Sequence, residues 1–171
     1  MGTLADWQIK GLCEKGMVTP FDATLLNPAS LDVRLGNLIY VEIGDDLKLT
    51  DISKATKDNP WYLHPNEFIL AQTQEEFNIP NILCATFALK SSLARIGFEH
   101  LLAGFIDPGF NNSVLTLELK NARTSKSLPL WPGMRIGQII FQKMSKLPLK
   151  SYKESGRYNG DKQVTQCKGI L

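Results

Sequence analysis

Cysteine, histidine and long apolar runs are scarce in this sequence, and each scarcity argues against a class of protein. The 171 residues include three cysteines, Cys13, Cys84 and Cys167, and two histidines. Because the cysteines are odd in number and widely separated, they argue against a disulfide framework and for a reducing compartment. No Cys-x-x-Cys pair is present, so the sequence shows no zinc motif. No run of about 18 apolar residues occurs, so we expect no membrane span.

An excess of charge of one sign is also lacking. Nineteen Lys and Arg residues face 17 Asp and Glu residues, which gives a net charge of +2. Such a small charge does not suggest general nucleic-acid binding. The first residues lack the basic and apolar regions of a secretory signal. We therefore expect a cytoplasmic protein that binds neither nucleic acid nor membranes, built as a single domain over residues 1–171.

Short β-rich runs separated by turn signals follow an N-terminal segment, about 3–15, that has helical spacing. Strands are predicted, with a glycine bend in the first, at 33–43, 68–73, 82–89, 114–119 and 134–144. Asn-Pro, Asp-Pro-Gly and Trp-Pro-Gly turns separate them. This pattern predicts an all-β sandwich, jelly roll or barrel. The polar segment 150–171 is predicted as a C-terminal arm, either a disordered end or a flap that closes over a ligand.

The segment Lys90–Arg95 combines two cations, two serine hydroxyls and a predicted helix start at Ser91 or Ser92. Free N–H groups at a helix start favour an anion. Arginine can grip a phosphate with two parallel hydrogen bonds, whereas lysine acts as a point charge. The segment is therefore a candidate polyphosphate site. The alternative is an ordinary helix cap flanked by two solvated cations.

The strand at 114–119 carries one acidic residue among apolar ones. Side-chain alternation places its leucines on one face and Thr116, Glu118 and Lys120 on the other. A partly buried carboxylate has a raised pKa and can move protons near neutral pH, which makes Glu118 a candidate acid–base catalyst. The alternative is a surface Glu118 paired with Lys120. Asp107, which precedes Pro-Gly, suits either a turn or a site.

Six motifs occur in a fixed order along the chain. They are Ser30-Leu-Asp-Val-Arg-Leu-Gly36, His64-Pro-Asn-Glu-Phe68, Lys90-Ser-Ser-Leu-Ala-Arg95, Ala103–Phe110 with Leu117–Leu119, Pro132–Gln138 and Gly156–Gly160. Together they resemble the dCTP deaminase and dUTPase superfamily, on the deaminase side. The resemblance implies a mainly β, distorted jelly-roll barrel of the dUTPase-like type with short helices. It also implies a homotrimer whose active sites lie at subunit interfaces.

The resemblance further implies a role for each site residue. Glu118 would activate a water for attack on C4 of cytosine, pass the proton to N3 and help ammonia to leave. Asp107 would meet the deoxyribose 3′-hydroxyl, and the backbone around Thr116 would read the base. No protein-ligated catalytic metal is implied, and Mg²⁺ would arrive with the triphosphate. The remaining predicted contacts, to phosphates or base, are Lys90, Ser91, Ser92, Arg95, Gln138, Tyr152, Arg157 and Asp161.

The activity implied by the resemblance is hydrolysis of dCTP to dUTP and ammonia, which supplies dUMP and dTTP synthesis in a bacterium or in a virus-infected bacterial host. Phe105 favours one alternative, a bifunctional enzyme that releases dUMP and pyrophosphate. A second alternative is a non-catalytic nucleotide sensor with the same fold. It is motivated by Asp161, where glutamine is usual, and by about one extra residue in Asn111–Ser113. The relatives also make dTTP a candidate inhibitor.

Overall fold

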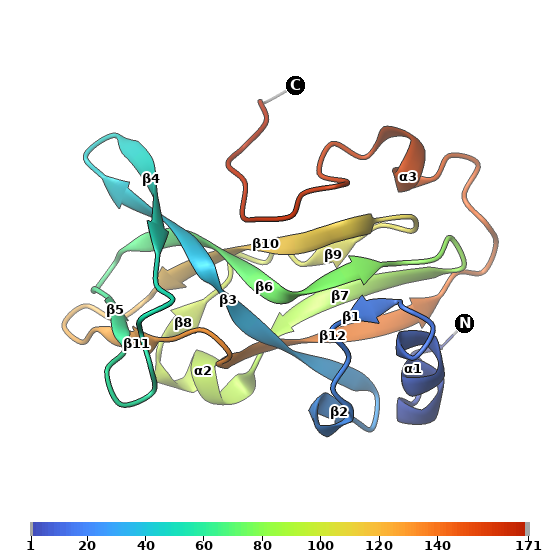
Figure 1. Cartoon of the computed structure of the whole chain (residues 1–171), viewed down its shortest axis with the longest axis horizontal. Coiled ribbons are helices and arrows are strands. Elements are labelled where there is room, and N and C mark those ends of the chain that lie inside the picture. Colours follow the sequence, from blue (N-terminus) through green and yellow to red (C-terminus); the bar gives the residue numbers. More distant parts are fainter. Residues whose placement is uncertain (1, 170–171) are drawn as a thin grey trace.

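The structure, a computed structural model, describes residues 2–169 and consists mainly of antiparallel strands (Figure 1). Residues 170–171 of the predicted C-terminal arm lie outside this range. The helices are α1 (Asp6–Cys13), α2 (Ser91–Ile96) and α3 (Tyr152–Ser155), with a 3₁₀ turn at Ala23–Leu25. The strands are β1 (Val18–Thr19), β2 (Leu26–Asn27), β3 (Ser30–Ile43), β4 (Asp46–Asp51), β5 (Trp61–Leu63), β6 (Phe68–Asn78), β7 (Leu83–Leu89), β8 (Phe98–Glu99), β9 (Phe105–Ile106), β10 (Asn111–Asn121), β11 (Leu128–Leu130) and β12 (Arg135–Lys143).

Within the described residues, ten strands form one curled sheet. Its main path runs β8-β10-β6-β3-β12-β7-β9, while β1 pairs with β6, and both β2 and β4 pair with β3. The two remaining strands, β11 and β5, pair with each other. The prediction of a mainly β fold with short helices is therefore confirmed. The homotrimer stays a prediction.

The long strand β3 links the two halves of the sheet. Its residues 31–34 pair with β12, whereas from Leu35 onward it pairs with β6. The predicted glycine bend lies where the partner changes. A Cβ atom on Gly36 would stand 2.6 Å from Cγ of Gln72, so a larger residue would displace that side chain. Gly36 thus leaves room for Gln72, which holds the C-terminal tail.

Strand β10 presents Glu118 on its partly exposed face, as alternation predicts. Thr116, Glu118 and Lys120 are partly exposed, and the alternate leucines 115, 117 and 119 are buried. Burial of each leucine contributes about 1.5–3 kcal/mol. A slip of one residue would exchange the two faces and bury the carboxylate in the core. Packing of the leucines therefore fixes the direction of Glu118.

Strand β10 is irregular at Asn111–Ser113, where the resemblance suggested about one extra residue. The pairing with β6 shifts there, and Asn112 has a positive φ of 53°. Its backbone N–H donates to Oδ1 of Asn78 at 3.0 Å. A second shift lies between Val114 and Thr116, and from Thr116, which pairs with Gln72, the ladder is regular to Lys120. The end of the strand that carries the candidate catalytic residue is therefore regularly paired with β6.

Candidate active site

A cavity of about 500 Å³ lies beside β10 and brings together five of the predicted site residues. They are Asp107, Thr116, Glu118, Tyr152 and Asp161. Phenylalanine, leucine and isoleucine side chains make up much of the remaining wall. Mostly apolar walls with a few convergent polar groups are typical of small-molecule sites. The dimensions suit a nucleoside.

Glu118 lines this cavity and forms no ion pair with any residue in the described range 2–169. Burial raises the pKa of the Glu118 carboxyl above its ordinary value, and a contact with its own backbone offsets this only in part. Among residues 2–169, the ion pairs do not include one between Glu118 and Lys120. The carboxyl is therefore placed to gain and lose a proton, as a general acid and base must.

The C-terminal tail runs beside β10 (Figure 1). Several of its residues, Asp161 and Thr165–Cys167 among them, line the cavity. The backbone N–H of Val164 donates to Oε1 of Gln72 at 2.8 Å. The next N–H, of Thr165, donates to Oγ1 of Thr116 at 3.2 Å. Val164 is completely buried, so it anchors this part of the tail. The Thr116 side chain thus holds the tail, a function that the sequence did not indicate.

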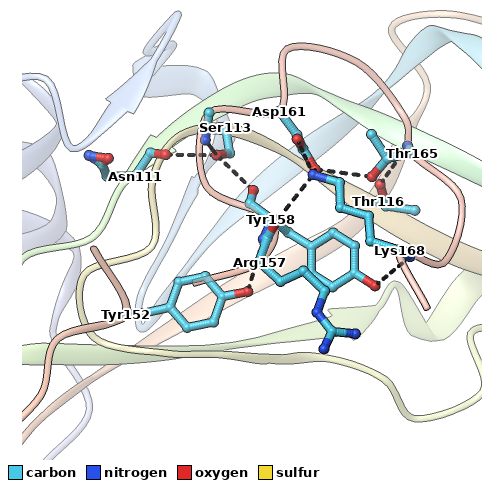
Figure 2. A network of polar contacts seen from close by, with 10 residues as sticks. Asn111, Ser113, Thr116, Tyr152, Arg157, Tyr158, Asp161, Thr165 and Lys168 are labelled. Carbon is cyan, nitrogen blue, oxygen red and sulfur yellow. Dashed lines mark hydrogen bonds and ion pairs between the residues drawn. The ribbon is translucent and has the colours of Figure 1, made fainter. Parts of the chain in front are cut away.

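A lysine within the tail balances the charge of Asp161 (Figure 2). Nζ of Lys168 lies 2.6 and 2.8 Å from the two carboxylate oxygens of Asp161, and it also donates to the carbonyl of Arg157 at 3.1 Å. The Thr165 hydroxyl donates to the same carboxylate at 3.1 Å. Lys168 was not among the predicted site residues. The two residues lie seven apart in an irregular segment, where spacing gives no signal.

The other two predicted residues of the tail differ in position. Tyr152 lines the cavity, packs against Phe110 with ring centres 6.0 Å apart, and accepts a hydrogen bond from the N–H of Tyr158. Arg157 does not line the cavity, and its guanidinium donates to the carbonyl of Gly169. Tyr152 therefore belongs to the cavity wall, whereas Arg157 belongs to the contacts that hold the tail together.

The predicted phosphate segment lies outside the cavity. Helix α2 begins at Ser91, one of the two predicted starts, and its six residues end at Ile96, followed by Gly97 with a φ of 113°. Ser91, Ser92 and Arg95 are exposed. Nζ of Lys90 donates to Oδ1 of Asp32 at 2.8 Å. A single chain therefore does not join this segment to the cavity that holds the candidate catalytic carboxyl.

Gln138 also lies outside the cavity, on β12. Its Oε1 accepts a hydrogen bond from the hydroxyl of Ser30 at 2.8 Å. In the β3–β12 ladder it stands opposite Asp32. Gln138 is thus near the residue that binds Lys90. Ser30 and Asp32 were not among the predicted site residues, because this part of β3 is buried on both faces and alternation does not mark them.

Residues 2–169 contain no cluster of three or more His, Cys, Asp and Glu side chains suited to a metal ion. None of the helices in this range has the length and apolar character needed to cross a membrane.

Comparison with known proteins decides the family. Residues 3–144 match the family model described as dCTP deaminase-like. The chain belongs to the dCTP deaminase family. A dUMP-forming dCTP deaminase of Corynebacterium efficiens is 38% identical over 184 residues, which cover 98% of this chain and 94% of the relative. Its counterpart in Mycobacterium marinum is 40% identical over 162 residues, which cover 86% and 84%.

A solved structure supports the fold. The 2′-deoxycytidine 5′-triphosphate deaminase from Agrobacterium tumefaciens superimposes with a TM-score of 0.66 at 22% identity. The match covers 84% of this chain and 48% of that one. At this identity the likeness concerns the fold, and it agrees with the dUTPase-like architecture expected from the sequence.

The relatives correct the prediction that dUTP is the product. The relatives from Corynebacterium efficiens and Mycobacterium marinum are dUMP-forming, as is a relative in Streptomyces avermitilis that is 37% identical over 98% of this chain. The sequence-based error has a physical origin. Motifs around Glu118 report chemistry at the base, whereas the product also depends on whether a phosphate bond is broken. Phe105, which favoured the dUMP-forming alternative, lines the cavity.

Proposed function

We propose that this chain is a hydrolase that converts dCTP into dUMP, ammonia and pyrophosphate. One water replaces the amino group at C4 of cytosine, and ammonia leaves. A second water attacks the α-phosphorus, and the bond from that phosphorus to the oxygen that bridges it to the β-phosphorus breaks, so pyrophosphate leaves. The names of the relatives support the reaction and its product. The observation that carries the proposal for this chain is the unpaired, partly buried Glu118 in a nucleoside-sized cavity.

Glu118 is the proton carrier of the deamination. Its carboxylate takes a proton from the water that attacks C4, and the carboxylic acid then delivers that proton to N3. Glu118 then takes the proton of the new C4 hydroxyl and delivers it to the amino group, so that C4=O forms as the C4–N bond breaks and ammonia leaves. Since burial raises the pKa of Glu118, the acid form is accessible at the stage when it must donate. General acid–base catalysis of this kind contributes about 10²–10⁴-fold, so positioning in the cavity must contribute the rest.

The cavity orients the nucleoside part of dCTP. Asp107 binds the deoxyribose 3′-hydroxyl, and the backbone around Thr116 reads the base. Tyr152 closes the wall on the tail side, and Asp161 helps to hold the tail. An unpaired carboxylate near the triphosphate would repel it. Asp161 does not do so, because Lys168 already neutralises its charge.

The triphosphate binds to residues outside the cavity of the same chain. Lys90, Ser91, Ser92 and Arg95 supply cations and hydroxyls, with contributions from Gln138 and from Arg157. Because these residues do not line the cavity, the proposal includes a homotrimer in which one subunit's phosphate segment meets another's cavity. Mg²⁺ enters with the substrate as its triphosphate complex.

One incubation tests the proposal. The purified chain is mixed with dCTP and Mg²⁺, and ammonia, pyrophosphate and nucleotides are measured over time. We expect ammonia, pyrophosphate and dUMP in equal amounts. Accumulation of dUTP without pyrophosphate would disprove the phosphate step, and absence of ammonia would disprove the deamination. Binding of dCTP without any product would indicate the nucleotide sensor instead.

A further inference from the structure

Strand β3 supports two of the predicted substrate-binding residues. Ser30 and Asp32 are two residues apart on the strand, so their side chains lie on the same face. Ser30 donates to Oε1 of Gln138 at 2.8 Å. Asp32 accepts from Nζ of Lys90, also at 2.8 Å. Strand β3 therefore meets both β12 and the residue that starts α2.

Asp32 is buried, whereas its cationic neighbours reach the surface. Asp32 is 1% exposed, and Nδ2 of Asn27 donates to its Oδ1 at 2.7 Å. The side chain of Lys90 is 26% exposed. The guanidinium of Arg135 lies 3.7 Å from the other carboxylate oxygen. A buried carboxylate without a partner is costly, so Asp32 holds the ammonium of Lys90 in place while leaving it accessible.

We propose that Asp32 is a positioning residue for the triphosphate, acting through Lys90. A free lysine side chain carries about 2 kcal/mol of rotamer entropy. Asp32 removes much of that freedom before the substrate arrives, so less is lost when a phosphate oxygen binds. This inference rests on the proposed function, because it needs Lys90 to contact the triphosphate of dCTP.

The sign of one substitution separates positioning from simple electrostatics. Asp32→Asn removes a negative charge beside the phosphate segment. If charge alone mattered, the variant would bind the anionic triphosphate more tightly. If Asp32 positions Lys90, the variant binds more weakly although it is more positive. The two accounts therefore predict opposite changes in affinity.

The experiment measures dCTP affinity by titration calorimetry in the presence of Mg²⁺, in a Glu118→Gln background that prevents turnover. Asp32→Asn should weaken binding about tenfold, equivalent to about 1.4 kcal/mol. Asp45→Asn is the matched control, since it changes the net charge equally at an exposed turn before β4. The control should stay within about twofold. Unchanged or tighter binding by a folded Asp32→Asn variant would overturn the inference.

Coupling to Lys90 gives a second readout that a purely structural role would not move. In a Lys90→Met background, Asp32→Asn should weaken binding by less than about twofold, because the two residues act as a unit. Additive losses would refute action through Lys90. If Asp32→Asn does not fold, Asn27→Ala takes its place. We expect it to weaken dCTP binding by a smaller factor, and this loss should also disappear in the Lys90→Met background; unchanged affinity would count against the proposal.

Failure of the Glu118→Gln protein, with Asp32 and Lys90 intact, to bind dCTP would contradict the proposed function.

Discussion

Two neighbouring strands carry glutamates whose surroundings differ completely. Glu75 on β6 is fully buried and accepts hydrogen bonds from the backbone N–H of Arg34 at 2.9 Å and from its Nε at 2.7 Å. Glu118 on β10 faces a cavity, and burial raises its pKa without a matching cation. The first carboxylate is locked into the fold, and the second is free to exchange protons. Burial of an acid is therefore a sign of chemistry only where its charge is left uncompensated.

The same criterion separates the acids that line the cavity. Asp107 is exposed, and Asp161 is paired with Lys168. Of these three acids, Glu118 alone is partly buried and unpaired. The pairing of Asp161 also weakens the nucleotide-sensor alternative, since the carboxylate has its own counterion in Lys168.

The largest expected effect comes from removing the free carboxyl. Glu118→Gln keeps the shape of the side chain but cannot accept a proton, so kcat for ammonia release should fall at least about 10²–10⁴-fold. Affinity for dCTP, measured by calorimetry, should change by less than about threefold, because the substitution leaves the cavity wall intact. Turnover close to that of the wild type would show that the proton carrier lies elsewhere.

The same substitution at the paired glutamate should act on stability. Glu75→Gln removes a fully buried carboxylate that accepts two hydrogen bonds from the partly buried Arg34 and leaves Arg34 with its longer ion pair to Asp22 at 3.8 Å, so the free energy of unfolding should fall by about 1–3 kcal/mol. Urea denaturation measures this loss. Glu76→Gln is the matched control, because the neighbouring glutamate pairs with Lys162 at the surface and should cost less than about 1 kcal/mol. Equal losses for both variants would erase the distinction between the two regions.

Breaking the ion pair between Asp161 and Lys168 should have an intermediate effect on activity. Lys168→Met leaves Asp161 uncompensated beside the cavity and loosens the tail, so KM for dCTP should rise about three- to tenfold. Adding Asp161→Asn should restore part of the loss, because the repulsive charge is then gone. Lys150→Met, at an exposed position, controls for the change in net charge. The ion pair would have no role in substrate binding if both lysine variants gave the same KM as the wild type.

Sequence reasoning predicted what depends on regular spacing. Alternating leucines fixed the direction of Glu118, the glycine bend in β3 lies where expected, and α2 begins at Ser91. The pairing of Lys168 could not be predicted, because the tail has no periodicity. Asp32 was overlooked because the first part of β3 is buried on both faces, so alternation gives no signal there. The product was predicted wrongly because the recognised motifs report on the base more than on the phosphates.

The smallest predicted effect tests the cost of keeping Glu118 unpaired. Below about pH 4 the carboxyl is protonated in both folded and unfolded chains, so Glu118→Gln and wild type should have similar stability. As pH rises, the unfolded chain ionises first, because burial raises the pKa of Glu118 in the folded protein. The wild type therefore loses stability relative to the variant until the pH passes the folded-state pKa. At neutral pH the variant should melt about 1–4 °C higher.

A series of thermal melts between about pH 4 and pH 8 measures this gap in Tm, with Asp45→Asn as a control that should show no such growth. A gap that is constant with pH, or that shrinks as pH rises, would mean that the carboxyl is compensated by a group in the folded protein. Glu118 would then resemble Glu75, and the contrast between the two strands would fail. A gap that opens with rising pH, together with lost turnover, would show that the same carboxyl costs stability and supplies catalysis, as expected where an active site keeps a charge uncompensated.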